Sequence, residues 1–383
     1  MASRPVEPDP SVWWERYGYR LEPRPGATTT DRRRAGPEGP GEHVGAVGST
    51  GDRSPIASQQ QDGTPGTPGT AGELSSETIL RARPDEPASG WRRAVLRATG
   101  GLVNPGPSPA EVQWRDQLHR IRHPLLQSHR IAVTSIKGGV GKTTAATLLG
   151  LVMAENRGDR VIVLDANPDA GTLADRLTGE SSVTVRELLR DIARIHSWTE
   201  VSRYTSLAGR LQVLASEQDP ASSDAFNRDE YEAICELLDR FFNIIITDSG
   251  TGLVHSAMDG TLKLADSIIV VGAPTVDGAG RASKTLDWLH AHGHAALASE
   301  AVVVLSCDRV SAEVDRARIS EHFTSRCRAV VELPHDPHLA TGGRVELARL
   351  RPSTRHAAYR LAALMADRFA SPQPPPAATA GPQ

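Results

Sequence analysis

The sequence predicts an α/β fold built on a doubly wound, mostly parallel sheet. From residue 130 to about residue 368, short apolar runs alternate with stretches of helical composition, as expected for repeated βαβ units. The run at 161–164 contains only apolar residues and suits a strand that is buried on both faces. A glycine-rich loop at 136–144 follows the first apolar run and precedes a helix, which gives the order strand, loop, helix.

Apolar runs bounded by turn residues predict the strands, and the stretches between them predict the helices. Strands are predicted at 131–134, 161–164, 211–214, 242–248, 267–271 and 301–306, and helices at 145–156, 185–195, 229–240, 278–290 and 312–323. The loops at 272–274 and 307–309 each end a predicted strand, so they are candidates for contact with a nucleotide base.

The glycine-rich loop is the clearest functional signal. Gly138, Gly139 and Gly141 let the backbone fold tightly, so that its N–H groups and the helix N-terminus converge on phosphate oxygens. Lys142 adds a positive charge, and Thr143 supplies a hydroxyl group for Mg²⁺. The predicted nucleotide-binding residues are Lys137, Gly138, Gly139, Val140, Gly141, Lys142, Thr143 and Thr144.

Two acidic residues stand at the carboxyl ends of predicted strands. Open α/β sheets bind ligands outside those ends, so Asp165 and the loop after it are expected to face the nucleotide. Asp248 ends a mostly apolar run in the pattern of a Walker B carboxylate, which would hold Mg²⁺ opposite Thr143. An acidic strand end can also be a simple helix cap.

Composition divides the chain into four predicted segments. They are residues 1–88 as a disordered Pro/Gly-rich region, 89–128 as a basic helical arm, 129–370 as the α/β domain that contains the glycine-rich loop and 371–383 as a disordered tail. Within the arm, Ser108 and Glu111 have the spacing of a capping box, which predicts a helix that starts near Pro109.

The N-terminal region contains one group of residues that is unusual for a solvated segment. Four aromatic residues lie within seven positions: Trp13, Trp14, Tyr17 and Tyr19. They are a candidate short motif for a protein partner, and the alternative is an accidental cluster or a local contact with the domain.

Charge and cysteine content set further expectations. The net charge of −3 implies no strongly charged partner, and the three cysteines have no metal-binding spacing, so we expect buried thiols in a reducing cytoplasm. No apolar run reaches the length of a transmembrane helix, and the N-terminus lacks a hydrophobic signal core. A cytoplasmic location is therefore expected.

The loop departs from the ordinary P-loop pattern, because Ile136 stands where that pattern requires its first glycine. The sequence from Lys137 to Thr144 instead resembles the deviant Walker A motif of the ParA/MinD family of P-loop ATPases, in which an additional lysine opens the loop. The resemblance covers residues 130–368 and implies ATP and Mg²⁺ as cofactors. It also assigns Gly250 and Gly252 to a second switch near the γ-phosphate, the alternative being an ordinary strand-to-helix loop.

Three further segments carry the resemblance. Residues 330–336 are similar to the family's last strand and the loop that lines the base. Residues 102–125 and 165–173 resemble an actinobacterial branch associated with type VII (ESX) secretion, the EspI-like proteins.

The family's mechanism implies a homodimer formed on ATP, in which Lys137 of each subunit reaches the phosphates held by the other. In the family's first switch a second aspartate orients the attacking water, but here Asn167 takes its place. An amide holds water but does not accept a proton at neutral pH. We therefore expect a slow ATPase with Lys137, Asn167 and Asp165 as catalytic residues and Asp169 as a further stand-in.

Three functions fit these patterns. The first is a regulatory or positioning ATPase for type VII secretion with a protein partner bound through the N-terminal region, and the second is a DNA-partitioning ATPase. The third is an ATP-sensing adaptor that does not hydrolyse. Non-specific DNA binding would use five arginines, which also suit a solvated helix face: Arg344, Arg349, Arg351, Arg355 and Arg360.

Overall fold

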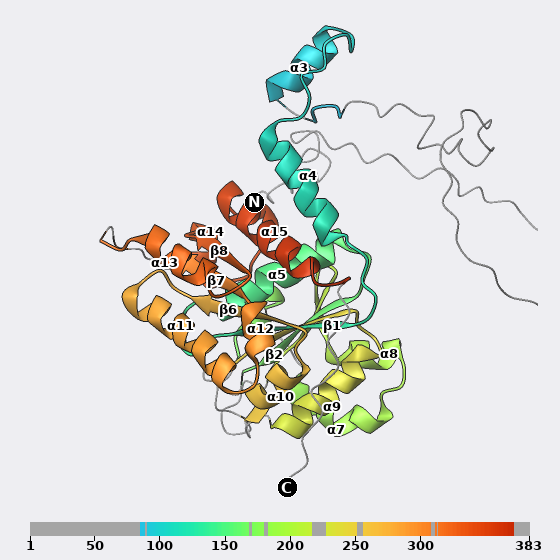
Figure 1. The fold of residues 1–383 in the computed structure, drawn as a ribbon. Coiled ribbons are helices and arrows are strands. Elements are labelled where there is room, and N and C mark those ends of the chain that lie inside the picture. The colour runs from blue at the N-terminus through green and yellow to red at the C-terminus, as the bar shows by residue number, and fades with distance from the viewer. Residues whose placement is uncertain are drawn as a thin grey trace, which may run out of the picture. The chain divides into compact units, whose positions relative to one another are not determined.

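The computed structural model of the 383-residue chain describes residues 85–88, 90–167, 171–179, 183–216, 227–250, 256–307, 311 and 313–370 (Figure 1). The chain divides into two compact units, one that ends at Glu111 and one that begins at Val112. The aromatic cluster at 13–19 and the predicted tail at 371–383 lie outside the described residues.

The first unit contains α3 (Gly90–Ala98) and the first turn of α4 (Pro109–Ile121). None of the α3 residues is buried. The Arg92 guanidinium donates hydrogen bonds to three carbonyl groups of the segment before α4, those of residues 105, 106 and 107, at 3.0, 3.3 and 3.1 Å. The Glu111 N–H donates to the Ser108 hydroxyl at 3.2 Å, which confirms the predicted start of this helix at Pro109.

The second unit contains an eight-stranded sheet in the order β3-β4-β2-β5-β1-β6-β7-β8. Its strands are β1 (His129–Thr134), β2 (Val161–Ala166), β3 (Ser206–Ala208), β4 (Leu211–Leu214), β5 (Ile244–Ser249), β6 (Ser267–Gly272), β7 (Val302–Cys307) and β8 (Ala329–Pro334). All neighbours pair in parallel except β3, which runs antiparallel to β4 at one edge. Strands extend from β1 in both directions, which confirms the doubly wound, mostly parallel sheet.

Helices cover both faces of this sheet. After α4 they are α5 (Lys142–Asn156), α6 (Leu173–Leu177), α7 (Val185–Asp191), α8 (Trp198–Val201), α9 (Arg228–Asp239), α10 (Ser256–Leu264), α11 (Val276–Ala291), α12 (Ala295–Ser299), α13 (Arg316–Thr324), α14 (Pro337–Ala340) and α15 (Pro352–Ala366). Figure 1 shows α5 and α15 on one side of the sheet and α9 and α10 on the other. Among the described helices, none combines the length and apolar character needed to cross a membrane.

Alternation along the strands separates two core layers. Ile131 and Val133 join the core cluster that contains α5 and α15, whereas Ala132 joins the cluster of α10 and α11. Because successive side chains of a strand point to opposite faces, a strand buried on both sides must be apolar at consecutive positions. The continuous apolar run at 161–164 has this arrangement in β2, whose six residues are all buried.

Part of α4 packs within the second unit. Trp114 lies against Tyr359 of α15 with ring centroids 4.3 Å apart, and Ile121 is fully buried. Arg120 forms an ion pair with Asp367 at 2.7 Å. The remainder of this helix is therefore held to the domain by aromatic packing and one ion pair.

Several element boundaries differ from the sequence predictions by a few residues, and two of these differences have a clear local cause. α5 begins at Lys142 rather than at residue 145, because the left-handed backbone of Gly141 ends the loop directly before it. α13 begins at Arg316 rather than at residue 312, because the Asp315 carboxylate accepts a hydrogen bond from the Arg318 N–H and caps the helix there. The antiparallel strand β3 was not predicted, since three residues give too short a pattern.

Candidate nucleotide site

The loop after β1 forms a tight turn. The Ser135 hydroxyl accepts a hydrogen bond from the Lys137 N–H at 3.0 Å and donates one to the Lys137 carbonyl at 2.8 Å. Gly139 and Gly141 have φ angles of 72° and 96°. Residues with a side chain rarely adopt this left-handed backbone conformation, so glycine suits both positions. Because α5 begins directly after Gly141, the unpaired N–H groups of its first turn can bind an anion at the loop.

The two lysines of the loop have different surroundings. Lys142 is only 8% exposed, and burial lowers the pKa of its ammonium group while the charge of Asp248 opposes that shift. Lys137 lies nearer the solvent, and its Nζ forms an ion pair with Asp277 Oδ2 at 2.6 Å. This hydrogen bond, with a second from Arg281, holds the pKa of the Asp277 carboxyl below its usual range. Lys142 is thus fixed inside the site, whereas Lys137 is held by α11.

Asp165 and Asp248 lie side by side at the carboxyl ends of β2 and β5. The two residues are direct partners in the parallel register of these strands. Burial raises the pKa of both carboxyl groups, and the charge of Asp248 raises that of Asp165 further. A hydrogen bond from the Thr143 hydroxyl and the charge of Lys142 act in the opposite direction on Asp248. The pair concentrates negative charge beside the phosphate loop.

Asp165 also organises the loop that follows β2. Its Oδ1 accepts a hydrogen bond from the Asn167 N–H at 3.1 Å, and its Oδ2 accepts one from the Leu173 N–H at 3.2 Å. A Cβ atom at Gly171 would lie 1.9 Å from Asp165 Oδ2, so this position has no room for a side chain. The carboxylate of Asp165 therefore anchors the loop on which Asn167 lies.

The oxygen atoms beside the phosphate loop fit Mg²⁺. Asp248 Oδ1 is buried and has no hydrogen-bond partner among the described residues. Mg²⁺ takes oxygen ligands and is usually held by one or two carboxylates together with substrate phosphates. Within the described part of the chain, no group of three His, Cys, Asp or Glu side chains would hold a metal ion without such a phosphate. Thr143 and Asp248 thus suit a cation that binds together with a nucleotide.

The remaining predicted residues are only partly covered. Gly250 is buried directly after β5, whereas Gly252 and Asp169 lie outside the described residues, as do residues 308 and 309 of the candidate base loop at 307–309. Asp336 at the end of the last predicted loop caps α14 and accepts a hydrogen bond from the Arg351 N–H at 2.8 Å. Its carboxylate therefore serves the local fold.

The five arginines considered for DNA binding lie in α15 and the segment before it. Arg344, Arg349, Arg351 and Arg360 are exposed, and Arg355 is half-buried. Their exposure is compatible with both readings, DNA binding and a solvated surface.

Three residues near the loop were not identified from the sequence. The Arg176 Nη1 donates a hydrogen bond to the Thr144 hydroxyl at 3.1 Å, and Asp277 pairs with Lys137. A Cβ atom at Gly141 would lie 3.1 Å from the hydroxyl oxygen of Ser306, so the end of β7 also borders the loop. No local motif marks these positions, since only the strand order brings their elements together.

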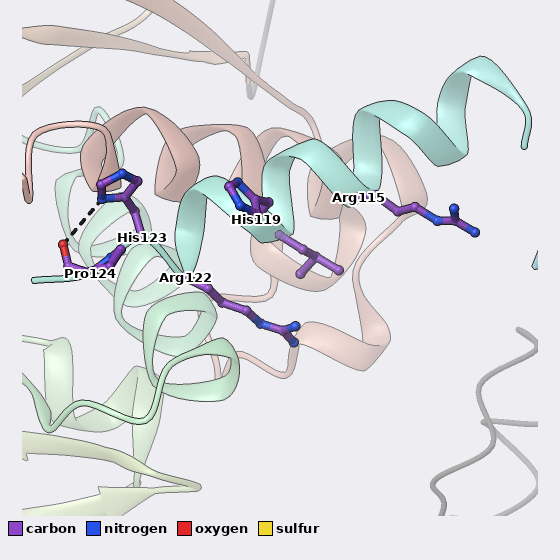
Figure 2. Close-up of a pocket in the computed structure, with 6 residues that line it drawn as sticks. Arg115, His119, Arg122, His123 and Pro124 are labelled. Carbon is purple, nitrogen blue, oxygen red and sulfur yellow. Dashed lines mark hydrogen bonds between the residues drawn. The ribbon is translucent and has the colours of Figure 1, made fainter. Parts of the chain in front are cut away.

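A separate cavity of about 520 Å³ lies along α4. Figure 2 shows the residues that line it: Arg115, Leu118, His119, Arg122, His123 and Pro124. The Arg122 Nε donates a hydrogen bond to the Asn156 carbonyl at the end of α5, at 3.3 Å. The cavity shares no lining residue with the loop at 136–144 and is distinct from the nucleotide site.

Comparison with known families places this site in a wider group. A family model described as the CobQ/CobB/MinD/ParA nucleotide binding domain matches residues 131–323. The chain belongs to this family. The match begins in β1 and includes the phosphate loop, Asp165 and Asp248, so the site described above lies within the shared domain.

Individual relatives agree with this assignment. The ESX-1 secretion-associated protein EspI of Mycobacterium tuberculosis (strain H37Rv) is 34% identical over 285 residues, which are 73% of this chain and 42% of EspI. The septum site-determining protein MinD of Synechocystis is 29% identical over 164 residues, or 42% of this chain and 59% of MinD. The chain therefore spans less than half the length of EspI.

A solved structure supports the fold. The ParA family ATPase from Chlorobium tepidum aligns with a TM-score of 0.54 at 16% identity, over 62% of this chain and 98% of that one. At this identity the likeness concerns the fold, which is the ParA/MinD-like arrangement.

Removal of the Asp248 charge is expected to stabilise the protein without nucleotide. Its pKa of about 6 in the folded state lies above its ordinary value of 3.8, so the folded state binds more protons between these values. The free energy of unfolding therefore falls as pH rises to about 6, and the loss is complete above that pH. Asp248→Asn should raise the free energy of unfolding at pH 8 by about 1–3 kcal/mol, measured in urea, and by less at pH 4.

Asp277→Asn is the matched control, because Asp277 is an exposed carboxylate at the same edge of the sheet and its pKa is lowered. It should give no gain in stability at pH 8. A loss of stability in Asp248→Asn at this pH would contradict the unfavourable burial inferred for Asp248.

Proposed function

We propose that this protein is a Mg²⁺-dependent ATPase that dimerises on ATP and acts as a regulatory switch for type VII secretion. The observation that carries the ATPase proposal is that Lys142 and Asp248 are both buried beside the phosphate loop and that each charge acts on the pKa of the other group. The lysine supplies charge for phosphates, and the carboxylate has an oxygen without a partner among the described residues.

Each residue of the site has a distinct role in this proposal. Lys142 and the backbone N–H groups of the loop would bind the phosphates, and Thr143 with Asp248 would hold Mg²⁺. Bound there, Mg²⁺ would supply positive charge against the phosphate oxygens. Asn167 orients the attacking water by hydrogen bonds, and Asp165 positions Asn167 through its N–H group. Without a carboxylate at position 167, phosphate release is slow.

Lys137 is the residue that links nucleotide state to dimerisation. In the structure Asp277 and Lys137 neutralise each other at the surface of the domain. To reach a phosphate held by the partner subunit, the Lys137 ammonium group must leave the Asp277 carboxylate and bind the phosphates, which carry more negative charge. ATP therefore joins two subunits, and hydrolysis releases them.

The secretion role rests on the similarity to EspI, which extends over 73% of this chain. The matched region is longer than the nucleotide-binding family match at 131–323, so it includes sequence outside that domain core. We infer a cytoplasmic protein that contacts a secretion component through its N-terminal region. DNA partitioning through the exposed arginines and ATP sensing without hydrolysis are the competing functions.

The first test concerns the dimer. Wild-type protein should have the mass of a dimer with Mg²⁺-ATP and of a monomer with ADP, measured by light scattering. Lys137→Ala should remain monomeric and lose phosphate release by at least about 10³-fold, as expected for a residue that acts like an arginine finger. Lys284→Ala, an exposed lysine on α11, is the control and should behave as wild type. A normal ATP dimer of Lys137→Ala would exclude this role.

The second test concerns the first switch. Asn167→Asp should raise the turnover rate by about tenfold to a hundredfold, because a carboxylate can orient the water and accept its proton. The dissociation constant for ATP should change little. Asn243→Asp is a matched control at the opposite end of the sheet, where the side-chain oxygen accepts a hydrogen bond from the Arg160 N–H. Equal turnover of Asn167→Asp and wild type would show that Asn167 does not limit the rate.

The third test separates secretion from partitioning. In the organism that encodes the protein, Lys142→Ala should reduce the type VII substrates found in culture filtrate while chromosome segregation remains normal. Lys284→Ala again provides the control. Loss of DNA segregation with normal secretion would instead support the partitioning function.

A further inference from the structure

Arg176 connects a second element to the phosphate loop. It lies on α6, whose residues Leu173, Ala174 and Leu177 are buried in the core. Its carbonyl accepts a hydrogen bond from the Val345 N–H at 2.8 Å. The backbone of Arg176 is therefore fixed both by the core and by the segment that precedes α15.

The side chain of Arg176 extends to the first turn of α5. Its Nη1 donates a hydrogen bond to the Thr144 hydroxyl at 3.1 Å, and its positive charge acts on Asp248. Among the described residues, no carboxylate lies within ion-pair distance of this guanidinium. A half-buried arginine that gives one hydrogen bond to a neutral hydroxyl keeps most of its five N–H donors for another acceptor.

Arg176 and Asp277, the partner of Lys137, follow strands that lie on opposite sides of β1. Arg176 follows β2, which lies beyond β5 on one side of β1. Asp277, which pairs with Lys137, follows β6 on the other side of β1. Arg176 contacts Thr144, which directly follows Lys142 and Thr143 in the sequence. In a P-loop the lysine serves the β- and γ-phosphates, and the backbone N–H groups serve the α- and β-phosphates.

We propose that Arg176 is a nucleotide-binding residue that contacts the α- and β-phosphates of ATP and ADP. The inference rests on the proposed ATP site and assigns to it a further cation, besides Lys137 and Lys142, that lies outside the loop motif. A guanidinium group presents two parallel N–H donors that match two phosphate oxygens. The contact with Thr144 holds the side chain at the loop before the nucleotide binds.

Titration calorimetry with Mg²⁺-ADP and Mg²⁺-ATP tests this role. Arg176→Ala should raise the dissociation constants of both nucleotides by the same factor, about tenfold to a hundredfold, as expected for the loss of a charge-assisted hydrogen bond. Arg176→Lys keeps the charge and should recover part of the affinity. Arg190→Ala, which removes an exposed arginine from α7, should bind both nucleotides as wild type does.

The alternative role of Arg176 is a structural brace between α6 and α5. A lower melting temperature of Arg176→Ala with unchanged dissociation constants would show the brace and overturn the proposal. A loss confined to ATP would overturn the assignment to the α- and β-phosphates, because ADP shares both. If wild-type protein binds neither nucleotide, the ATP site itself is wrong, and this failure appears before any variant is compared.

Discussion

Two buried carboxylates on neighbouring parallel strands set the conditions for the whole site. The register of β2 and β5 places Asp165 beside Asp248, and burial opposes charge on both. Asp165 is stabilised by backbone N–H groups, whereas Asp248 depends on Thr143 and on the charge of Lys142. Two buried carboxylates side by side are expected to cost stability in the absence of a ligand, which is consistent with the cation site proposed above.

Among the described residues, three cations lie in or beside the phosphate loop, and each has different surroundings. Lys142 is buried opposite Asp248, Lys137 is paired with Asp277 on α11, and Arg176 contacts only the neutral hydroxyl of Thr144 among the described polar side chains. A triphosphate bound at the loop would offer several negative charges to these groups. Its binding would therefore replace weak or unfavourable contacts by charge-assisted hydrogen bonds on both sides of β1.

Helix α5 determines the positions of Lys142, Thr143 and Thr144, because these residues form its first turn. Leu148, Leu149, Val152 and Met153 are fully or almost fully buried, and the helix packs against α15 as well as the sheet. The first turn of α5, which carries Lys142 to Thr144, is therefore held by the core of the domain. Ten of the fifteen residues of α5 are buried, so the glycine loop is followed directly by a helix that belongs to the core.

The sequence by itself determined the parallel architecture, the phosphate loop and the two acidic strand ends. These features depend on local patterns: consecutive apolar residues in β2, glycines whose backbone must turn tightly, and acids directly after apolar runs. The strand order was decided by tertiary packing, because the sequence of a buried parallel strand does not indicate which position the strand takes in the sheet. Only that order puts Asp165 next to Asp248, brings Asp277 to Lys137 and brings Arg176 to Thr144 across 32 positions of sequence. Long-range contacts of single side chains leave no periodic signal, and so these partners became visible only in the folded chain.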